Sequence, residues 1–252
     1  MEVEVAKTFE ALQKAEKEHQ IRPEEAKIFD IRPQAKPLPL SFKLSPQVAD
    51  EYQRMKHLIL NANTEKKIKT ILFASAKEGE GTSTTLRNFA ITLAAGGDRV
   101  LLIDANLRNP ALHDLFNVDR KVGFTELVRG NNSLADTIKK TEIQNLHIIT
   151  NGIPHSNPSS VLESKLLDSL LAQMKDQADW VLFDCAPINS YNDSCTLATK
   201  MDGVMMVIEA ENTRWEVAQS TKERIESDKV KLLGVVLNRR KMYIPDWAYK
   251  ML

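Results

Sequence analysis

Residues 68–95 read IKTILFASAKEGEGTSTTLRNFAITLAA, and this stretch decides the fold. An apolar run that ends at Ser75 predicts a buried strand, and the pattern from Leu86 onward predicts a helix. A strand, a glycine-containing loop and a helix together form a phosphate cradle, because loop N–H groups converge on the anion and the helix adds its positive dipole end. The residues expected to bind a nucleotide phosphate are Gly79, Glu80, Gly81, Thr82, Ser83 and Thr84.

The loop departs from the usual phosphate-loop pattern at Thr82, which takes the position of the lysine that reaches the β- and γ-phosphates. Ser83 follows it, where a hydroxyl ligates Mg²⁺. Loss of a charge-assisted hydrogen bond of about 1.5–3 kcal/mol is expected to weaken nucleotide binding about ten- to a hundredfold. Glu78 and Glu80 add negative charge beside the phosphate path. Because the loop N–H groups are unchanged, we expect binding to be reduced and not abolished.

Beyond the loop, apolar strand-like runs alternate with helical patterns. The predicted strands are Ile68–Ser75, Arg99–Asp104, Leu146–Asn151, Trp180–Asp184, Gly203–Ile208 and Lys231–Asn238. Several runs are continuously apolar, which is typical of strands buried on both faces of a parallel sheet. Ligands in such sheets bind at the carboxyl ends of the strands. We therefore expect an α/β fold with its chemistry near residues 76–84, 104–108, 184–187 and 238.

A strand-end carboxylate follows the loop by about a hundred residues, in the run VLFDCAP at 181–187. Asp184 is predicted to lie on the metal side of the phosphates. Its neighbour Cys185 is predicted to be a core residue with no reactive thiolate. The chain's two cysteines, Cys185 and Cys195, provide neither a disulfide framework nor metal-ligand spacing.

Two of these stretches resemble motifs of one family. Residues 79–85, GEGTSTT, resemble the Walker A motif of the bacterial tyrosine kinases (BY-kinases) of capsule and exopolysaccharide export, where GEGKSTT is usual. Residues 101–108, LLIDANLR, resemble that family's Walker A′ motif, which ends in Asp-x-Asp-x-Arg. The resemblance extends from about residue 45 to 239. It implies a three-layer P-loop NTPase fold, with a mostly parallel sheet and helices on both faces, that binds ATP and Mg²⁺.

The resemblance also implies roles for individual residues. Asp104 matches the first Walker A′ aspartate, close to the metal and to the hydroxyl that is activated, so the implied metal ligands are Ser83, Asp104 and Asp184. Asn106 replaces the second aspartate and removes a negative charge from the Mg²⁺ neighbourhood. The implied catalytic residues are Asp104, Lys77, Asp184 and Arg108.

Two of the matched positions have a simpler alternative. Lys77 matches the signature lysine of related deviant-Walker ATPases, which reaches the phosphates of a partner subunit, but it is equally interpretable as a solvated loop lysine. Asn238 matches the place where related ATPases bind adenine, and the alternative is a turn residue at a strand end.

The chain divides into three predicted parts. Residues 1–20 form a predicted helix whose apolar stripe consists of Val5, Phe9 and Leu12. This helix either folds back on the main domain or frays, or it docks on a partner protein. Residues 21–48 hold five of the ten prolines and no glycine, which indicates an extended linker. Residues 49–252 form the kinase-like domain, whose tail holds Tyr243 and Tyr249 either in a packed closing segment or in a phosphorylation cluster.

Composition and one further motif bear on partners. Glu51 and Arg54 match the family's Glu-x-x-Arg-x-x-Arg subunit-contact motif, in which His57 replaces the last arginine, so a homo-oligomer is implied. The 34 basic and 34 acidic side chains balance, which argues against nucleic-acid binding. There is no membrane-spanning apolar run and no signal peptide, so a cytoplasmic protein is expected. The resemblance implies a membrane-bound polysaccharide co-polymerase as activator, with membrane contact only through it.

Three functions remain as hypotheses. The first is an ATP-dependent tyrosine autokinase that works with the co-polymerase. The second is a catalytically weakened regulatory subunit of the same system, since Thr82 and Asn106 both depart from the family pattern. The third is a positioning ATPase of the ParA/MinD type, which the neutral composition and the lack of a basic amphipathic C-terminal helix disfavour.

Overall fold

The computed structural model describes residues 42–61, 68–154 and 158–241. The predicted N-terminal helix, most of the predicted linker and the two tail tyrosines lie outside these residues. None of the helices within the described ranges is long and apolar enough to cross a membrane.

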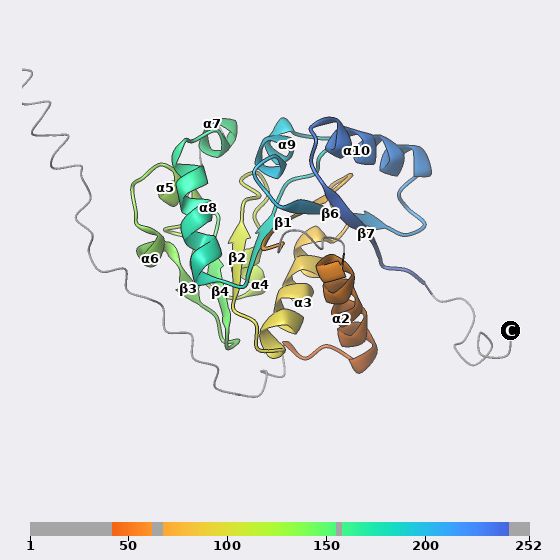
Figure 1. Ribbon diagram of the computed structural model, residues 1–252, viewed down its shortest axis with the longest axis horizontal. Coiled ribbons are helices and arrows are strands. Elements are labelled where there is room, and N and C mark those ends of the chain that lie inside the picture. The colour runs from red at the N-terminus through yellow and green to blue at the C-terminus, as the bar shows by residue number, and fades with distance from the viewer. Residues whose placement is uncertain (1–41, 62–67, 155–157, 242–252) are drawn as a thin grey trace, which may run out of the picture. The chain divides into compact units, whose positions relative to one another are not determined.

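Seven strands form one sheet in the order β3-β4-β2-β5-β1-β6-β7 (Figure 1). Their bounds are β1 Thr70–Ser75, β2 Val100–Asp104, β3 Lys139–Lys140, β4 Leu146–Ile149, β5 Trp180–Asp184, β6 Gly203–Glu209 and β7 Leu232–Asn238. All neighbours run parallel except β3, which pairs antiparallel with β4. The six predicted strands are confirmed. The edge strand β3 was not predicted, because two residues are too few to display a period.

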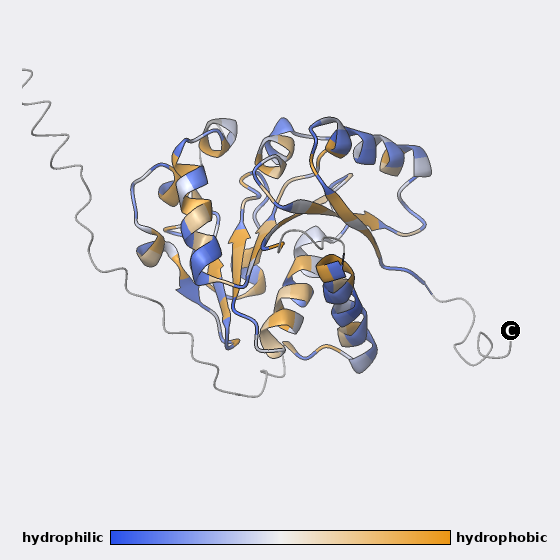
Figure 2. Ribbon diagram, viewed as in Figure 1, coloured by the Kyte–Doolittle hydropathy of each residue, from blue (hydrophilic) through white to orange (hydrophobic). Residues whose placement is uncertain are grey.

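Helices cover both faces of the sheet, so the predicted three-layer architecture is confirmed (Figure 1). Their bounds are α2 Pro46–Asn61, α3 Thr82–Ala95, α4 Leu112–Leu115, α5 Phe124–Val128, α6 Leu134–Thr137, α7 Pro158–Leu162, α8 Leu166–Gln177, α9 Asn192–Ala198 and α10 Trp215–Ser227. Figure 2 shows hydrophobic strands inside and hydrophilic outer sides on α2 and α10.

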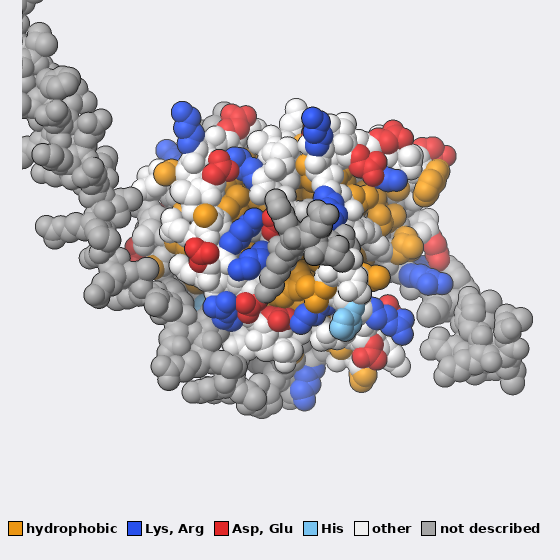
Figure 3. Space-filling view, viewed as in Figure 1, with side chains coloured by type: hydrophobic (Ala, Val, Ile, Leu, Met, Phe, Trp, Pro, Cys, Tyr) orange, Lys and Arg blue, Asp and Glu red, His pale blue; other side chains and the backbone are white. Residues whose placement is uncertain are grey.

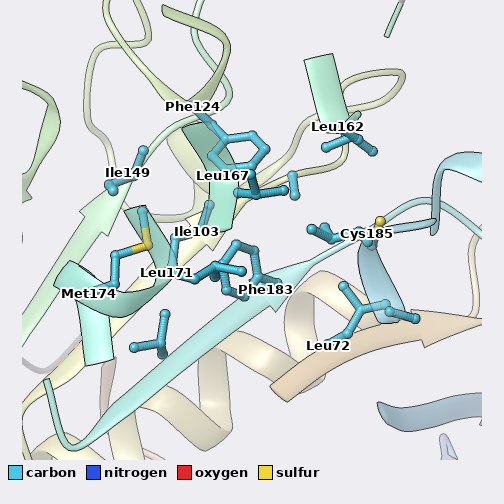
Figure 4. Close-up of a cluster of buried hydrophobic side chains, with 14 of the residues drawn as sticks. Leu72, Ile103, Phe124, Ile149, Leu162, Leu167, Leu171, Met174, Phe183 and Cys185 are labelled. Atoms are coloured by element: carbon cyan, nitrogen blue, oxygen red, sulfur yellow. The ribbon is translucent and has the colours of Figure 1, made fainter. Parts of the chain in front are cut away.

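Each face of the sheet carries its own core. Leu72 and Phe183 point to one face and pack against α5 to α10, and Figure 4 shows side chains of α8 gathered near Phe183. Their chain neighbours Phe73 and Leu182 point to the other face and pack against α2, α3 and α4. Because consecutive side chains of a strand alternate between faces, both faces can be apolar only if the strand is apolar throughout. This explains the continuous apolar runs.

The helix that follows the phosphate loop is anchored by Phe89, which is fully buried. The centroid of its ring lies 5.8 Å from that of Phe73 in β1 and 6.1 Å from that of Trp180 in β5. Tyr52 of α2 packs on its other side at 6.5 Å. These contacts hold α3 against the two central strands, so the N-terminus of α3 lies directly beyond the end of β1.

Helix α2 begins at Pro46, within the range predicted as linker. Ser45 precedes it and accepts a hydrogen bond from the Val48 N–H at 3.4 Å. Proline at the first helical position and serine before it are both favourable at a helix start, a signal that the proline-rich composition obscured. Phe42 is also buried, with its ring stacked on that of Phe116 at 5.9 Å.

We expect Phe89→Ala to lower the free energy of unfolding by about 3–5 kcal/mol, because it removes a ring from the centre of the core beneath α3. Denaturant titration of the full chain measures this change. Leu58→Ala is the control, since Leu58 on α2 is 70% exposed and should shift stability by no more than about 0.5 kcal/mol. Equal effects of the two substitutions would show that α3 is not anchored as described.

Candidate functional site

The phosphate loop connects the end of β1 to the start of α3. Gly79 and Gly81 both have left-handed backbone conformations, with φ of 82° and 87°. A Cβ atom on Gly81 would lie 2.1 Å from Nδ2 of Asn238, so a larger residue would be strained by its backbone conformation and would displace Asn238. Gly81 also occupies the N-cap of α3 and has no side chain with which to cap it. The first N–H groups of α3 are therefore left for an anion.

Two buried aspartates lie beside this loop. Asp104 ends β2 and Asp184 ends β5, and the two residues are paired in register across the adjacent strands. Both are fully buried. The Ser83 hydroxyl donates a hydrogen bond to Oδ2 of Asp184 at 2.5 Å. The three residues predicted to ligate Mg²⁺ are thus brought together by the fold.

The surroundings of these carboxylates disfavour negative charge. Burial raises the pKa of Asp184 to about 7, although hydrogen bonds from the Ser83 hydroxyl and the Cys185 N–H act to lower it. Burial, followed by the neighbouring charge of Asp184, raises the pKa of Asp104 well above its usual range. Two adjacent buried carboxylates ionise together only when a cation compensates them.

The donor set fits Mg²⁺. Oδ1 of Asp184 is buried and has no hydrogen-bond partner among the described residues. With the Ser83 hydroxyl, it offers the oxygen ligands that Mg²⁺ prefers. No group of three His, Cys, Asp or Glu side chains within the described ranges forms a complete metal site. Mg²⁺ typically uses one or two carboxylates and takes its remaining ligands from phosphates and water, so the incomplete set suits a nucleotide-bound ion.

Thr82, which replaces the usual loop lysine, and Lys77, which could provide a positive charge in its place, differ in exposure. Thr82 is 8% exposed, at the first position of α3. Lys77 is exposed, and no ion pair of its side chain occurs among the described residues. Its backbone is held, because its carbonyl accepts a 2.7 Å hydrogen bond from the Ser75 hydroxyl. The role of Lys77 stays a prediction.

The Arg108 guanidinium is directed toward α9. Its Nε and Nη2 donate to Oδ2 of Asp193 at 2.9 and 2.8 Å, and it lies 4.0 Å from the ring centroid of Tyr191. Asp193 also accepts a 2.5 Å hydrogen bond from the Ser159 hydroxyl. The sequence did not single out Asp193 or Tyr191 in this role, because neither belongs to a motif. Asn106 accepts a hydrogen bond from the Asn109 N–H at 3.0 Å and so shapes the loop that carries Arg108.

Two further elements meet the phosphate loop. Asn238, at the end of β7, donates to the backbone carbonyl of Glu80 at 2.8 Å. The Glu80 carboxylate is turned into the loop and is 2% exposed, whereas the sequence suggested a charge beside the phosphate path. It accepts a hydrogen bond from the hydroxyl of Thr213, which precedes α10. Thr213 was not predicted as a site residue. Thr84 is exposed at the start of α3.

The predicted subunit-contact residues lie on the surface of α2. Glu51 and Arg54 form an ion pair at 3.3 Å, with 71% and 74% of their side chains exposed. An exposed pair of this kind adds little stability. Both side chains are accessible, and their role in oligomerisation stays a prediction.

A phosphate loop, a seryl hydroxyl and two strand-end carboxylates on a parallel sheet define a P-loop NTPase, and a family model for an AAA domain matches residues 68–229. The chain is 33% identical over 194 residues to the tyrosine-protein kinase YwqD of Bacillus subtilis, covering 77% of this chain and 82% of that protein. The crystal structure of the chimerical protein CapA2B2 is 29% identical, with a TM-score of 0.75 over 79% of this chain and 87% of that one. The chain therefore belongs to the bacterial tyrosine-protein kinases.

The fold is shared more widely. MinD of Pyrococcus horikoshii, solved in complex with Mg-ADP, has a TM-score of 0.59 and 21% identity, covering 73% of this chain and 76% of that one. At this identity the likeness concerns the fold alone.

We expect Asp184→Asn to stabilise the nucleotide-free protein at pH 8. The pKa of Asp184 is about 7 in the folded chain against an ordinary 3.8, so the native state holds a proton that the unfolded state releases. The wild type therefore loses stability as pH rises from about 4 to 7, and the loss is complete above 7. Thermal unfolding at several pH values measures the difference, which should vanish below pH 4.

Asp202→Asn is the control, and we expect it to change stability at pH 8 in the opposite direction. Burial raises the pKa of Asp202, but hydrogen bonds from Lys175, Thr70 and Lys69 outweigh it, and the net pKa is lowered. This variant should be less stable than the wild type at pH 8, with the gap closing as pH falls below about 4. An Asp184→Asn variant that behaves like Asp202→Asn would contradict the assignment of a strained carboxylate pair.

Proposed function

We propose that the chain binds Mg-ATP at residues 79–84 and uses it for tyrosine autophosphorylation in capsule or exopolysaccharide polymerisation and export. The observation that carries the proposal is the meeting of Ser83, Asp104 and Asp184 beside the phosphate loop, where one buried carboxylate oxygen of Asp184 has no hydrogen-bond partner among the described residues. Membership of the bacterial tyrosine-protein kinases supports ATP as the nucleotide.

Each residue has a defined task in this proposal. The amides of the loop and of the first turn of α3 hold the phosphate oxygens, and the α3 dipole favours their charge. Ser83, Asp104 and Asp184 would hold Mg²⁺, which would neutralise charge on the transferring phosphoryl group. Asp104, whose pKa is raised by burial and by Asp184, accepts the proton of the attacking tyrosine hydroxyl.

The missing loop lysine has to be compensated by another cation. Lys77 is the candidate, because it belongs to the loop and its ammonium group is exposed. The guanidinium of Arg108 is already paired with Asp193, so Arg108 contributes to catalysis only if that ion pair opens. Lys77 acts either within its own subunit or on the nucleotide of a neighbouring subunit, with Glu51 and Arg54 at the contact between subunits.

The partner proposed is a membrane-bound polysaccharide co-polymerase, through which the chain reaches the membrane. Residues 1–20 are the proposed docking segment. On the face drawn in Figure 3, basic and acidic side chains are interspersed, and this agrees with a protein partner better than with a nucleic acid.

Calorimetric titration with Mg-ATP tests the cation assignment. We expect Lys77→Ala to weaken binding about tenfold or more, since it removes a charge-assisted hydrogen bond to phosphate. Thr82→Lys should strengthen binding about ten- to a hundredfold, because it restores the usual lysine. Phosphotyrosine detection on the same variants measures turnover.

Lys43→Ala is the matched control, since Lys43 lies outside the loop and should leave binding unchanged. A wild type that binds no Mg-ATP at millimolar concentration would overturn the proposal. Unchanged binding in Lys77→Ala would leave Lys77 as a solvated loop residue.

A second candidate function is a catalytically weakened regulatory subunit of the same system. It is favoured by Thr82 in place of the lysine, Asn106 in place of an acid and Arg108 held by Asp193. Wild-type protein that binds Mg-ATP without forming phosphotyrosine, while Thr82→Lys forms it, would select this alternative.

A further inference from the structure

We infer that Glu80 is a positioning residue, whose buried carboxylate holds the phosphate loop in its anion-binding shape and ties it to the β6–α10 connection through Thr213. The effect on nucleotide affinity rests on the proposed function, whereas the effect on the loop itself does not.

The carboxylate of Glu80 closes the loop on itself. Its Oε2 accepts hydrogen bonds from the backbone N–H groups of Ala76 at 2.8 Å and Lys77 at 3.0 Å. The side chain therefore joins the end of the loop next to α3 to its beginning, where the chain leaves β1. Carboxylate hydrogen bonds to backbone N–H groups are among the stronger ones in proteins, so this closure restricts the loop before any ligand arrives.

The same carboxylate joins the loop to a second part of the fold. Its Oε1 accepts a hydrogen bond from the Thr213 hydroxyl. The Thr213 N–H in turn donates to the carbonyl of Glu209 at 3.0 Å, at the end of β6. The Glu80 carbonyl is held separately by Asn238 of β7. The end of the loop next to α3 is thus held from the ends of two neighbouring strands, β6 and β7.

No lysine or arginine within the described ranges pairs with Glu80, although the residue is only 2% exposed. A buried carboxylate without a cation is unfavourable unless N–H and O–H donors satisfy it. Three donors do so here, from Ala76, Lys77 and Thr213. Donors of the loop and of the β6–α10 connection therefore accommodate the carboxylate, and its hydrogen-bonding geometry is what it contributes.

A positioning role and simple charge repulsion predict opposite changes in phosphate affinity for the substitution Glu80→Gln. If Glu80 acted only through its charge, Glu80→Gln would strengthen phosphate binding, because it removes a negative charge from the loop. If Glu80 positions the loop, Glu80→Gln weakens binding in spite of that removal. Glu78 is the matched control, since it is an exposed glutamate of the same loop, and Glu78→Gln removes the same charge without breaking the closure.

The first measurement is amide hydrogen exchange in the nucleotide-free full chain. The Ala76 and Lys77 amides should exchange at least about tenfold faster in Glu80→Gln and in Thr213→Val than in the wild type, because their acceptor is weakened or released. Thr213→Ser keeps the hydroxyl and should restore slow exchange. Asn212→Ala, which removes only a hydrogen bond to Glu209 from the same connection, should leave exchange unchanged.

The second measurement is calorimetric titration of the same variants with Mg-ATP and with inorganic tripolyphosphate. We expect Glu80→Gln and Thr213→Val to weaken both ligands about tenfold, at a temperature where circular dichroism shows the variants to be fully folded, with Thr213→Ser as the rescue. Glu78→Gln should bind as well as the wild type or better.

Two outcomes would overturn the inference. One is wild-type exchange of the Ala76 and Lys77 amides in Glu80→Gln, and the other is stronger binding in Glu80→Gln to the same degree as in Glu78→Gln. If the wild type binds neither ligand, the proposed function fails, and the exchange measurement still decides whether Glu80 holds the loop.

Discussion

The side-by-side pairing of β1, β5 and β2 is the constraint on which the rest of the structure depends. Parallel pairing brings their carboxyl ends to one edge, and the register opposes Phe73 to Asp184 and Asp104 to Asp184. The loop that leaves β1 must then pass the two carboxylates, and Ser83 reaches one of them. A shift of one residue would turn each aspartate toward the opposite face of the sheet, away from the loop. The apolar faces of the strands therefore determine where the polar chemistry lies.

The site is built from groups that work against stability. Asp104 and Asp184 are buried as neighbours, and burial raises the pKa of each. Glu80 is buried with no cationic partner in the part of the chain that the structure describes, and N–H and O–H donors satisfy it. Such groups persist because two apolar cores hold the surrounding strands and helices in place. A cation would compensate the charge of the two aspartates, which gives the binding of a metal ion a driving force that a site without buried carboxylates would lack.

The sequence predicted the strands and the strand-end residues well and the contacts of the site only in part. Continuous apolar runs located six strands to within two residues, because a strand buried on both faces must be apolar throughout. The grouping of Ser83 with Asp184 followed from the rule that parallel strands end at one edge. Thr213 and Asp193 escaped prediction, since each acts through a contact between residues far apart in the chain. The inward turn of Glu80 was missed for the same reason.

The sequence by itself determined the fold class, the position of the phosphate loop, the absence of its lysine and the family. These properties are local: periodicity, glycine placement and motif spacing are all read within a few dozen residues. Only the tertiary structure decided that Glu80 faces inward, that Arg108 is paired with Asp193 and that Oδ1 of Asp184 has no hydrogen-bond partner within the described ranges. Side-chain direction and burial depend on elements that are distant in the chain and meet only when the sheet is assembled. For this reason, sequence motifs identify the residues that form the site, but they do not show the direction, pairing or burial of their side chains.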